Sequence, residues 1–271
     1  MQLASTVAVD VFFAMSGFLI TMSWEVRPQA RDYLAARGLR ILPALWICLI
    51  LTAFVLAPIG VAVQGGSVNN FLWSTGPITY VLSNFFVFYL RQDINGTPTG
   101  VPVAGSWDSP LWSLSFEVLC YVSVLIVGLL GLVKYRWLSI GVLVVATVGA
   151  VLQGPLYYPG VWTLGQLATR CFIMFAAGAA LYQWREKIPA NWWLVALCTA
   201  VVFAAGVLAP DYRVVAGWAL AYVVIVSAAL VRGLNLHHDF SYAMYIYSFP
   251  VQQILVMAGL ISLPPLLFFG V

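Results

Sequence analysis

Three polar side chains in one long apolar run are the first sign of chemistry in this sequence. Ser113, Glu117 and Tyr121 recur every four residues, which places a hydroxyl, a carboxylate and a phenol along one face of a helix. Ser109 and Pro110 before them are typical of a helix start. A charge inside hydrocarbon costs about 2.5–3.5 kcal/mol to insert. We therefore expect this face to turn inward, where Glu117 either orients a reacting group in a cavity or neutralises a structural cation.

Two further charges, Asp10 and Arg170, lie within apolar runs and need partners or polar surroundings. Arg170 and Glu117 are expected at a similar depth on the outer side, so the two could form an ion pair. Alternatively, Arg170 binds an anionic or carbonyl group. Asp10 is expected either to hydrogen-bond a neighbouring helix or to take part in function.

Four arginines crowd the short connector before the apolar run 41–63. Basic residues beside a span favour the cytoplasmic side, and this effect alone could explain them. Guanidinium groups also match phosphate oxygens in bidentate geometry, which makes the connector a candidate phosphate-binding site. The four are Arg27, Arg31, Arg37 and Arg40.

The composition is that of an integral membrane protein. The chain has 271 residues, of which 63% are hydrophobic and 8% are charged, whereas a soluble domain carries about 25% charged residues. The surplus apolar surface must therefore face lipid. A net charge of +3 gives little support for a nucleic-acid partner, and the four cysteines lack metal-ligand spacing. We expect neither nucleic acid nor a metal.

The apolar runs and the basic connectors together predict the topology. The connectors on both sides of the run 71–90 are poor in basic residues, which predicts that both lie on the outer side of the membrane. This run should therefore not cross the membrane. We predict an all-α polytopic transmembrane bundle of about eight spans plus one re-entrant or interfacial helix, forming a single domain over residues 1–271. An alternative with a further span would place Lys134 and Arg136 outside. The apolar runs lie at 3–23, 41–63, 71–90, 111–133, 137–152, 165–184, 191–209, 214–231 and 241–262.

The first span raises a separate expectation. Its C-terminal end leads into the arginine-rich connector and is therefore cytoplasmic, so its N-terminus must start outside. Met1 abuts this span without a charged leader. We expect that the chain lacks one upstream helix that begins in the cytoplasm.

Four segments resemble the membrane-bound acyltransferase-3 family and occur in the family's order. They are Asp10–Ile20, similar to D-x-F-F-x-x-S-G-F-L-I; Tyr33–Ala44, which contains R-x-x-R-I-x-P; Leu111–Tyr121, similar to L-W-[ST]-L-x-x-E-x-x-x-Y; and Ser241–Tyr247, similar to S-Y-x-x-Y. The resemblance implies a multi-pass O-acyltransferase of the bacterial inner membrane. Such an enzyme takes an acyl group, typically acetyl, from acyl-CoA as co-substrate. The acceptor is a hydroxyl of a glycan, a lipid-linked sugar or another sugar-containing molecule, and no bound cofactor is implied.

The resemblance also assigns roles to residues of this chain. It implies that Glu117, with Ser113 and Tyr121, lies at the catalytic centre. The CoA phosphates would bind Arg31, Arg37 and Arg40. Residues expected along the substrate cavity are Asp10, Trp112, Arg170, Ser241, Tyr242 and Tyr245.

One part of the family pattern has no counterpart in this sequence. The family's first helix carries an arginine and the histidine thought to be catalytic, and no residue here matches them. The chain as given is therefore expected to be inactive or badly impaired.

Other functions remain open from the sequence. A transporter or flippase for glycans or lipids would also combine many spans with sparse internal charges, although no inverted repeat is visible. A non-catalytic subunit or gene remnant is the third reading, and the oligomeric state is left open.

Overall fold

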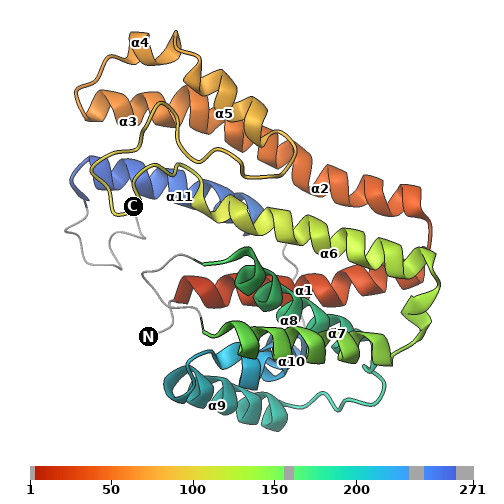
Figure 1. The fold of residues 1–271 in the computed structure, drawn as a ribbon. Coiled ribbons are helices and arrows are strands. Elements are labelled where there is room, and N and C mark those ends of the chain that lie inside the picture. Colours follow the sequence, from red (N-terminus) through yellow and green to blue (C-terminus); the bar gives the residue numbers. More distant parts are fainter. Residues whose placement is uncertain (1–3, 156–161, 232–240, 261–271) are drawn as a thin grey trace. The chain divides into compact units, whose positions relative to one another are not determined.

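A computed structural model of the protein describes residues 4–155, 162–231 and 241–260. For residues 4–5 and 241–244 it describes the backbone but not the side chains. These residues are helical or irregular and contain no strand (Figure 1). Contacts divide the chain into two compact units. Unit 1 comprises residues 1–35 and 116–235, and unit 2 comprises residues 36–115 and 236–271.

The helices confirm an all-α membrane bundle. Five are long and apolar enough to cross a membrane: Thr6–Val26, Ala30–Val63, Ser109–Leu129, Leu164–Gln183 and Tyr212–Leu230. Three shorter helices have 17 residues each, namely α7 (Trp137–Gln153), α9 (Trp192–Leu208) and α11 (Ser241–Met257). At 1.5 Å per residue each shorter helix is about 26 Å long. Within the described residues, the five long helices and the shorter apolar helices α7 and α9 are consistent with a helical membrane bundle, and the expected number of spans stays a prediction.

Unit 1 is built around the close approach of α1 (Ala4–Val26) and α8 (Leu164–Gln183). A Cβ added to Gly178 would lie 1.9 Å from the Ala14 carbonyl oxygen, and one added to Gly17 would lie 2.0 Å from that of Phe175. Only glycine lets two helix backbones approach so closely. Asp10 pairs with Arg170 near the start of both helices, and Phe18 packs on Tyr182 further along both, so α1 and α8 are parallel.

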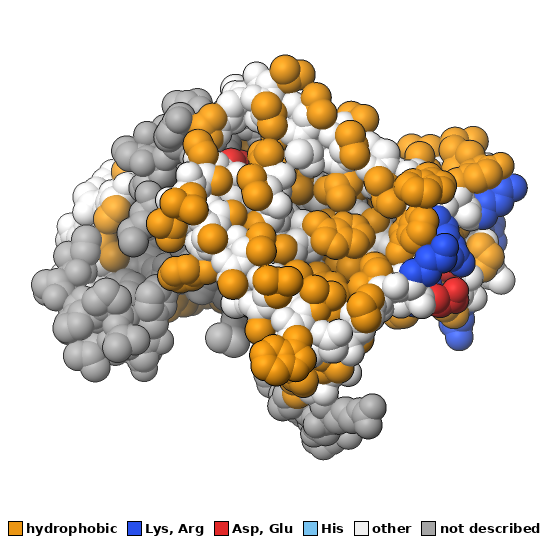
Figure 2. Space-filling view, turned by 90° about the horizontal axis from the view of Figure 1, so that it is seen from below, with side chains coloured by type: hydrophobic (Ala, Val, Ile, Leu, Met, Phe, Trp, Pro, Cys, Tyr) orange, Lys and Arg blue, Asp and Glu red, His pale blue; other side chains and the backbone are white. Residues whose placement is uncertain are grey.

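The basic connectors of unit 1 gather at one end. The Gln183 side chain donates to the Val133 carbonyl at 2.9 Å, and the Trp184 indole donates to the Arg136 carbonyl at 3.2 Å. Arg136 also lies 3.8 Å from Glu186. Figure 2 shows Lys and Arg side chains at one end of a largely hydrophobic face. This arrangement agrees with both connectors lying on one side of the membrane.

Unit 2 contains most of one long bent helix. Helix α2 (Ala30–Leu51) continues through the π-helical turn η1 (Thr52–Leu56) into α3 (Ala57–Val63), a run of 34 residues. The segment that holds Arg31, Arg37 and Arg40 is therefore helical, and the expectation of an arginine-rich connector there is wrong after Ala30. Alanine, leucine and arginine favour helix, so α2 extends beyond the apolar run that it contains.

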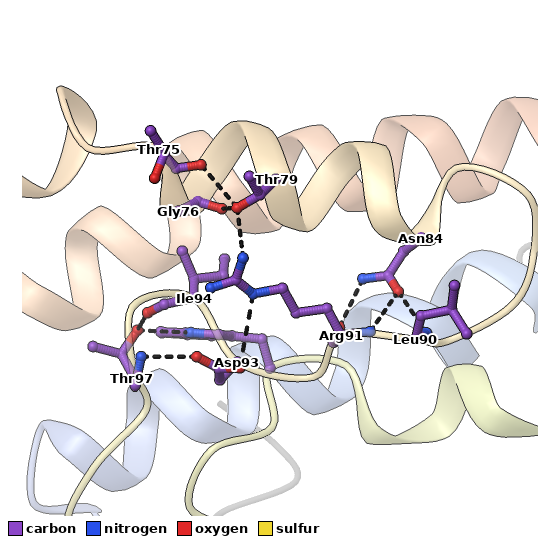
Figure 3. Close-up of polar contacts among 11 residues, drawn as sticks. Thr75, Gly76, Thr79, Asn84, Leu90, Arg91, Asp93, Ile94 and Thr97 are labelled. Carbon is purple, nitrogen blue, oxygen red and sulfur yellow. Dashed lines mark hydrogen bonds and ion pairs between the residues drawn. The ribbon is translucent and has the colours of Figure 1, made fainter.

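The run 71–90 contains no helix long enough to cross a membrane. It contains the end of α4 (Val68–Leu72) and α5 (Gly76–Asn84), and the nine residues of α5 reach only about 14 Å. After α5 the chain turns back, because Asn84 accepts from the Arg91 amide at 3.1 Å and the Arg91 guanidinium donates to Thr79 at 2.6 Å (Figure 3). The short helix α5 agrees with the expectation that this run does not cross a membrane, whereas its re-entrant or interfacial placement stays a prediction.

The glycine contact between α1 and α8 generates a prediction with a matched control. Replacing Gly178 by alanine should lower the free energy of unfolding by about 2 kcal/mol, because the added Cβ meets backbone that cannot move alone. Gly206 of α9 has open space around its Cβ position, so Gly206→Ala should be neutral or stabilising by up to about 1 kcal/mol. Denaturant titration of both variants in micelles measures the difference. Equal effects of the two substitutions would contradict the close contact.

Candidate active site

Glu117 and Tyr121 lie together on α6 (Trp112–Leu129) in the interior of unit 1. Their exposed fractions are 1% and 4%, and the Tyr121 hydroxyl donates to Glu117 Oε1. The Tyr33 hydroxyl donates to the Tyr121 carbonyl at 3.0 Å and so connects the start of α2 to this part of α6. The polar face expected to turn inward does so, because residues four apart on a helix lie one above the other.

Ser113, one turn earlier on α6, belongs to unit 2 and contacts Tyr245 of α11. The two hydroxyl oxygens are 2.8 Å apart. Both also lie near the Pro110 carbonyl oxygen, at 3.1 Å from Ser113 and 3.0 Å from Tyr245. Trp112 beside them is half-buried. The structure thus brings together two candidates that the sequence did not pair.

Two other candidates on α11, Ser241 and Tyr242, lie outside the described residues as far as their side chains are concerned. Their expected place along a substrate cavity stays a prediction.

Asp10 and Arg170 form a buried ion pair in unit 1. Arg170 Nε lies 2.9 Å from Asp10 Oδ1, and Arg170 Nη2 donates to the Thr6 carbonyl at 2.7 Å. Arg213 Nε approaches Asp10 Oδ2 at 2.7 Å. The pairing of Arg170 with Glu117 that we considered from the sequence is therefore wrong. The parallel packing of α1 on α8 brings Asp10, and not Glu117, to the guanidinium.

Sequence reasoning missed Arg213, which it placed in an outside connector. The residue lies in the first turn of α10 (Tyr212–Leu230) and is 3% exposed. Asp211 caps this helix by accepting from the Arg213 amide, and it also lies 2.9 Å from Arg213 Nη1. Two carboxylates thus balance two guanidinium groups, which removes the uncompensated charge that makes a lone buried ion so costly. The sequence did contain a signal for this role, because Arg213 follows the acidic Asp211 at the boundary of a predicted span.

The three arginines expected at the CoA phosphates do not all lie on one face of α2. Arg37 and Arg40 are three residues apart and share a face, whereas Arg31 lies about 180° around the helix from Arg40 at 100° per residue. Arg31 and Arg40 are exposed, and Arg37 is half-buried. This geometry allows Arg37 and Arg40 to reach one anionic group together.

The cavity expected around Glu117 stays a prediction. Unit 1 contains two hollows with largely apolar walls, which share Leu138, Val142 and Phe172, and Glu117 lines neither of them. Within the described ranges, no cluster of three or more His, Cys, Asp or Glu side chains could hold a metal ion.

A buried carboxyl group in unit 2 was also missed. Asp108 has no exposed surface. The Tyr80 hydroxyl donates to Asp108 Oδ2 at 2.6 Å, the Cys48 thiol approaches Oδ1 at 3.8 Å, and the Asp108 amide donates to the Tyr89 hydroxyl at 3.1 Å. Asp108 thereby ties α5 and α2 to the beginning of α6. The sequence analysis placed residues 91–110 in a connector on the outer side of the membrane, so it gave Asp108 no role.

Burial raises the pKa of Asp108 from 3.8 to about 7, although hydrogen bonds from Tyr80, Thr52 and Cys48 lower it in part. The same burial raises the pKa of the Tyr80 and Tyr89 hydroxyls. The carboxyl group therefore changes its charge close to neutral pH.

This raised pKa predicts how stability depends on pH. The folded protein binds the Asp108 proton more tightly than the unfolded chain, so the stabilisation is complete below about pH 3.8 and is lost as the pH rises through about 7. Asp108→Asn should remove this component. The difference in Tm between the wild type and the variant, measured at about pH 5 and about pH 8, should shift in favour of the variant at the higher pH. Parallel pH profiles would contradict the raised pKa.

Known proteins resemble this chain along most of its sequence. The sequence profile of acyltransferase family 3, described as an acyltransferase domain, matches residues 1–271. An O-acetyl transferase of Shigella phage Sf6 is 27% identical over 263 residues, which cover 93% of this chain and 75% of the relative. Nodulation protein 10 of Rhizobium leguminosarum bv. viciae is 25% identical over 284 residues, which cover 95% of this chain and 74% of the relative. No solved structure matches significantly. The chain therefore belongs to the acyltransferase-3 family and is a membrane acyltransferase.

Proposed function

We propose that this enzyme transfers an acyl group, specifically acetyl, from acyl-CoA to a hydroxyl of a glycan or another sugar-containing acceptor, which includes lipid-linked sugars. Its proposed location is the inner membrane of a bacterium. The observation that carries the proposal is a buried carboxylate on α6 in a chain that matches the family over its whole length. The phage relative is named as an O-acetyl transferase, which supports acetyl transfer to oxygen.

The proposed reaction exchanges a thioester for an ester. The acceptor oxygen bonds to the acyl carbon, the carbon–sulfur bond breaks, and the hydroxyl proton passes through a general base to the CoA sulfur. Glu117 orients the group that takes this proton and stabilises the positive charge that forms on it. Tyr121 supports the role because its hydroxyl fixes one carboxylate oxygen of Glu117. Ser113 and Tyr245 supply a second hydrogen-bonding pair that can contact the acceptor.

The proposed donor site lies along the first turns of α2. CoA carries several phosphate groups, and arginine binds phosphate through two parallel hydrogen bonds. Arg37 and Arg40 share one face of α2 and are proposed to hold these phosphates together. Arg31 contributes positive charge from another face, so its contribution should be the smallest of the three.

A carboxylate-to-amide change tests the proposed centre. Glu117→Gln keeps the size of the side chain but removes its charge. In protein that carries the family's first helix ahead of these residues, kcat for transfer of radiolabelled acetyl from acetyl-CoA should therefore fall about 100-fold or more. Tyr121→Phe should give a smaller loss of about tenfold. Glu25→Gln makes the same chemical change at an exposed position and serves as the control. Wild-type kcat in a folded Glu117→Gln protein would sink the proposed role.

A second set of variants tests the donor site. Arg37→Gln and Arg40→Gln should each raise the KM for acetyl-CoA about tenfold and leave kcat nearly unchanged, because charge-assisted phosphate contacts contribute about 1.5–3 kcal/mol. Arg31→Gln should raise KM less, since Arg31 lies on the opposite face of the helix from Arg40. Steady-state kinetics with varied acetyl-CoA separates the two parameters. An equal effect at all three positions would favour general electrostatic attraction over a defined site.

The transporter alternative has less support than the enzyme. The chain belongs to an acyltransferase family, and no feature of the described residues favours transport over acyl transfer.

A further inference from the structure

A long apolar groove runs between α7 and α8 in unit 1. Its main part is a hollow of about 540 Å³, whose floor and walls include Gly141, Ala146 and Gly149 of α7 and Ala168 of α8. A smaller hollow continues it toward Ser139 and Gln183. Small side chains on both helices leave this volume open, and its walls offer almost only hydrocarbon to an occupant.

The groove has the length of one membrane leaflet. It extends along α7 from Leu138 to Gly149, which corresponds to about 16 Å at 1.5 Å per residue. The hydrocarbon core of a bilayer is about 30 Å thick, so one leaflet contributes about 15 Å. The dimensions therefore suit a single hydrocarbon chain that enters from one end of the helix pair.

The mouth of the groove, near Ser139 and Gln183, is positively charged. The Ser139 hydroxyl donates to Gln183 Oε1 at 2.6 Å, and both residues also contact the carbonyls of the adjoining basic connector. Glu186 and Glu25 are the nearby acidic residues. The cations of the two connectors are Lys134, Arg136, Arg185 and Lys187. Cations thus outnumber carboxylates where a lipid headgroup would lie.

Two tryptophans mark the same end as a membrane interface. The Trp137 and Trp184 rings pack edge to face, with centroids 5.0 Å apart, and Trp137 is 70% exposed. Tryptophan concentrates at the level of lipid headgroups because its ring is apolar and its N–H is polar. The cations and the aromatic pair therefore lie at headgroup depth, with the apolar groove leading away from them.

We propose that this groove is a binding site for an anionic phospholipid. One acyl chain lies between α7 and α8, and the phosphate of the headgroup lies among Lys134, Arg136 and Arg185. Basic pockets between membrane helices bind anionic headgroups for the same electrostatic reason. The site is separate from the residues proposed for acyl transfer.

Native mass spectrometry tests the site on the full chain in detergent. The protein is incubated with equal amounts of dioleoylphosphatidylglycerol and dioleoylphosphatidylcholine, and the lipids retained on it are counted. The wild type should retain phosphatidylglycerol in at least about 25-fold excess, as expected for two cations near a headgroup at about 1 kcal/mol each. The double variant Lys134→Gln/Arg136→Gln should weaken phosphatidylglycerol binding about 25-fold. Equal retention of both lipids by the wild type would overturn the proposal.

A groove-filling variant tests the tail with a matched control. Gly141 lines the groove and has open space at its Cβ position, so Gly141→Leu places a side chain where the lipid tail should lie. Retention of phosphatidylglycerol should fall about tenfold. Gly206→Leu makes the same change at an open position on α9 and should leave retention unchanged. Unchanged binding by Gly141→Leu, or an equal loss in Gly206→Leu, would contradict a tail in this groove.

Two further readouts exclude other occupants. Glycerol 3-phosphate carries the headgroup charge without a tail and should not displace the bound lipid, whereas displacement would indicate a simple phosphate site. A lipid-free dimer of the wild type would show that a second copy fills the groove. If Gly141→Leu fails to fold, as judged by circular dichroism, the charge variant alone decides the proposal.

Discussion

The neutralisation of one buried carboxylate underlies the geometry of unit 1. Asp10 would be costly inside hydrocarbon, and it is tolerated because Arg170 and Arg213 approach its two oxygens. These contacts join α1, α8 and α10 at the end where all three helices begin. The glycine contact between α1 and α8 then sets their separation. The electrostatic partners and the close backbone packing support each other, since each requires the same parallel alignment of the helices.

Unit 2 also encloses a carboxyl group, and there hydroxyl and thiol groups approach it. Asp108 is fully buried, and hydroxyl and thiol groups approach it from α5 and α2. Its raised pKa means that the carboxyl group can be neutral near physiological pH, which lowers the cost of burial. Helix α5 is thereby held against the long helix that contains the π-helical turn η1. π-helical turns often occur near functional sites, and this one begins at Thr52, which helps to lower the pKa of Asp108.

Two helices carry most of the residues proposed for acyl transfer. Helix α2 holds the arginines proposed for the donor, and α6 holds Ser113, Glu117 and Tyr121. Each helix begins in one unit and continues in the other. An acyltransferase must keep its donor and acceptor groups in fixed relation, because catalysis by orientation is lost over small displacements.

The sequence by itself determined the membrane class, the helical spans, the non-crossing run 71–90 and the family. Each depends on local composition, on spacing or on the positive charges of connectors, which do not require knowledge of distant neighbours. The pairing of charges was decided only by tertiary structure. Spacing showed that Asp10, Glu117 and Arg170 needed partners, but the choice of Asp10 for Arg170 follows from the parallel packing of α1 on α8. Asp108 and Arg213 likewise gained their roles only when distant segments enclosed them and removed the water around their charges.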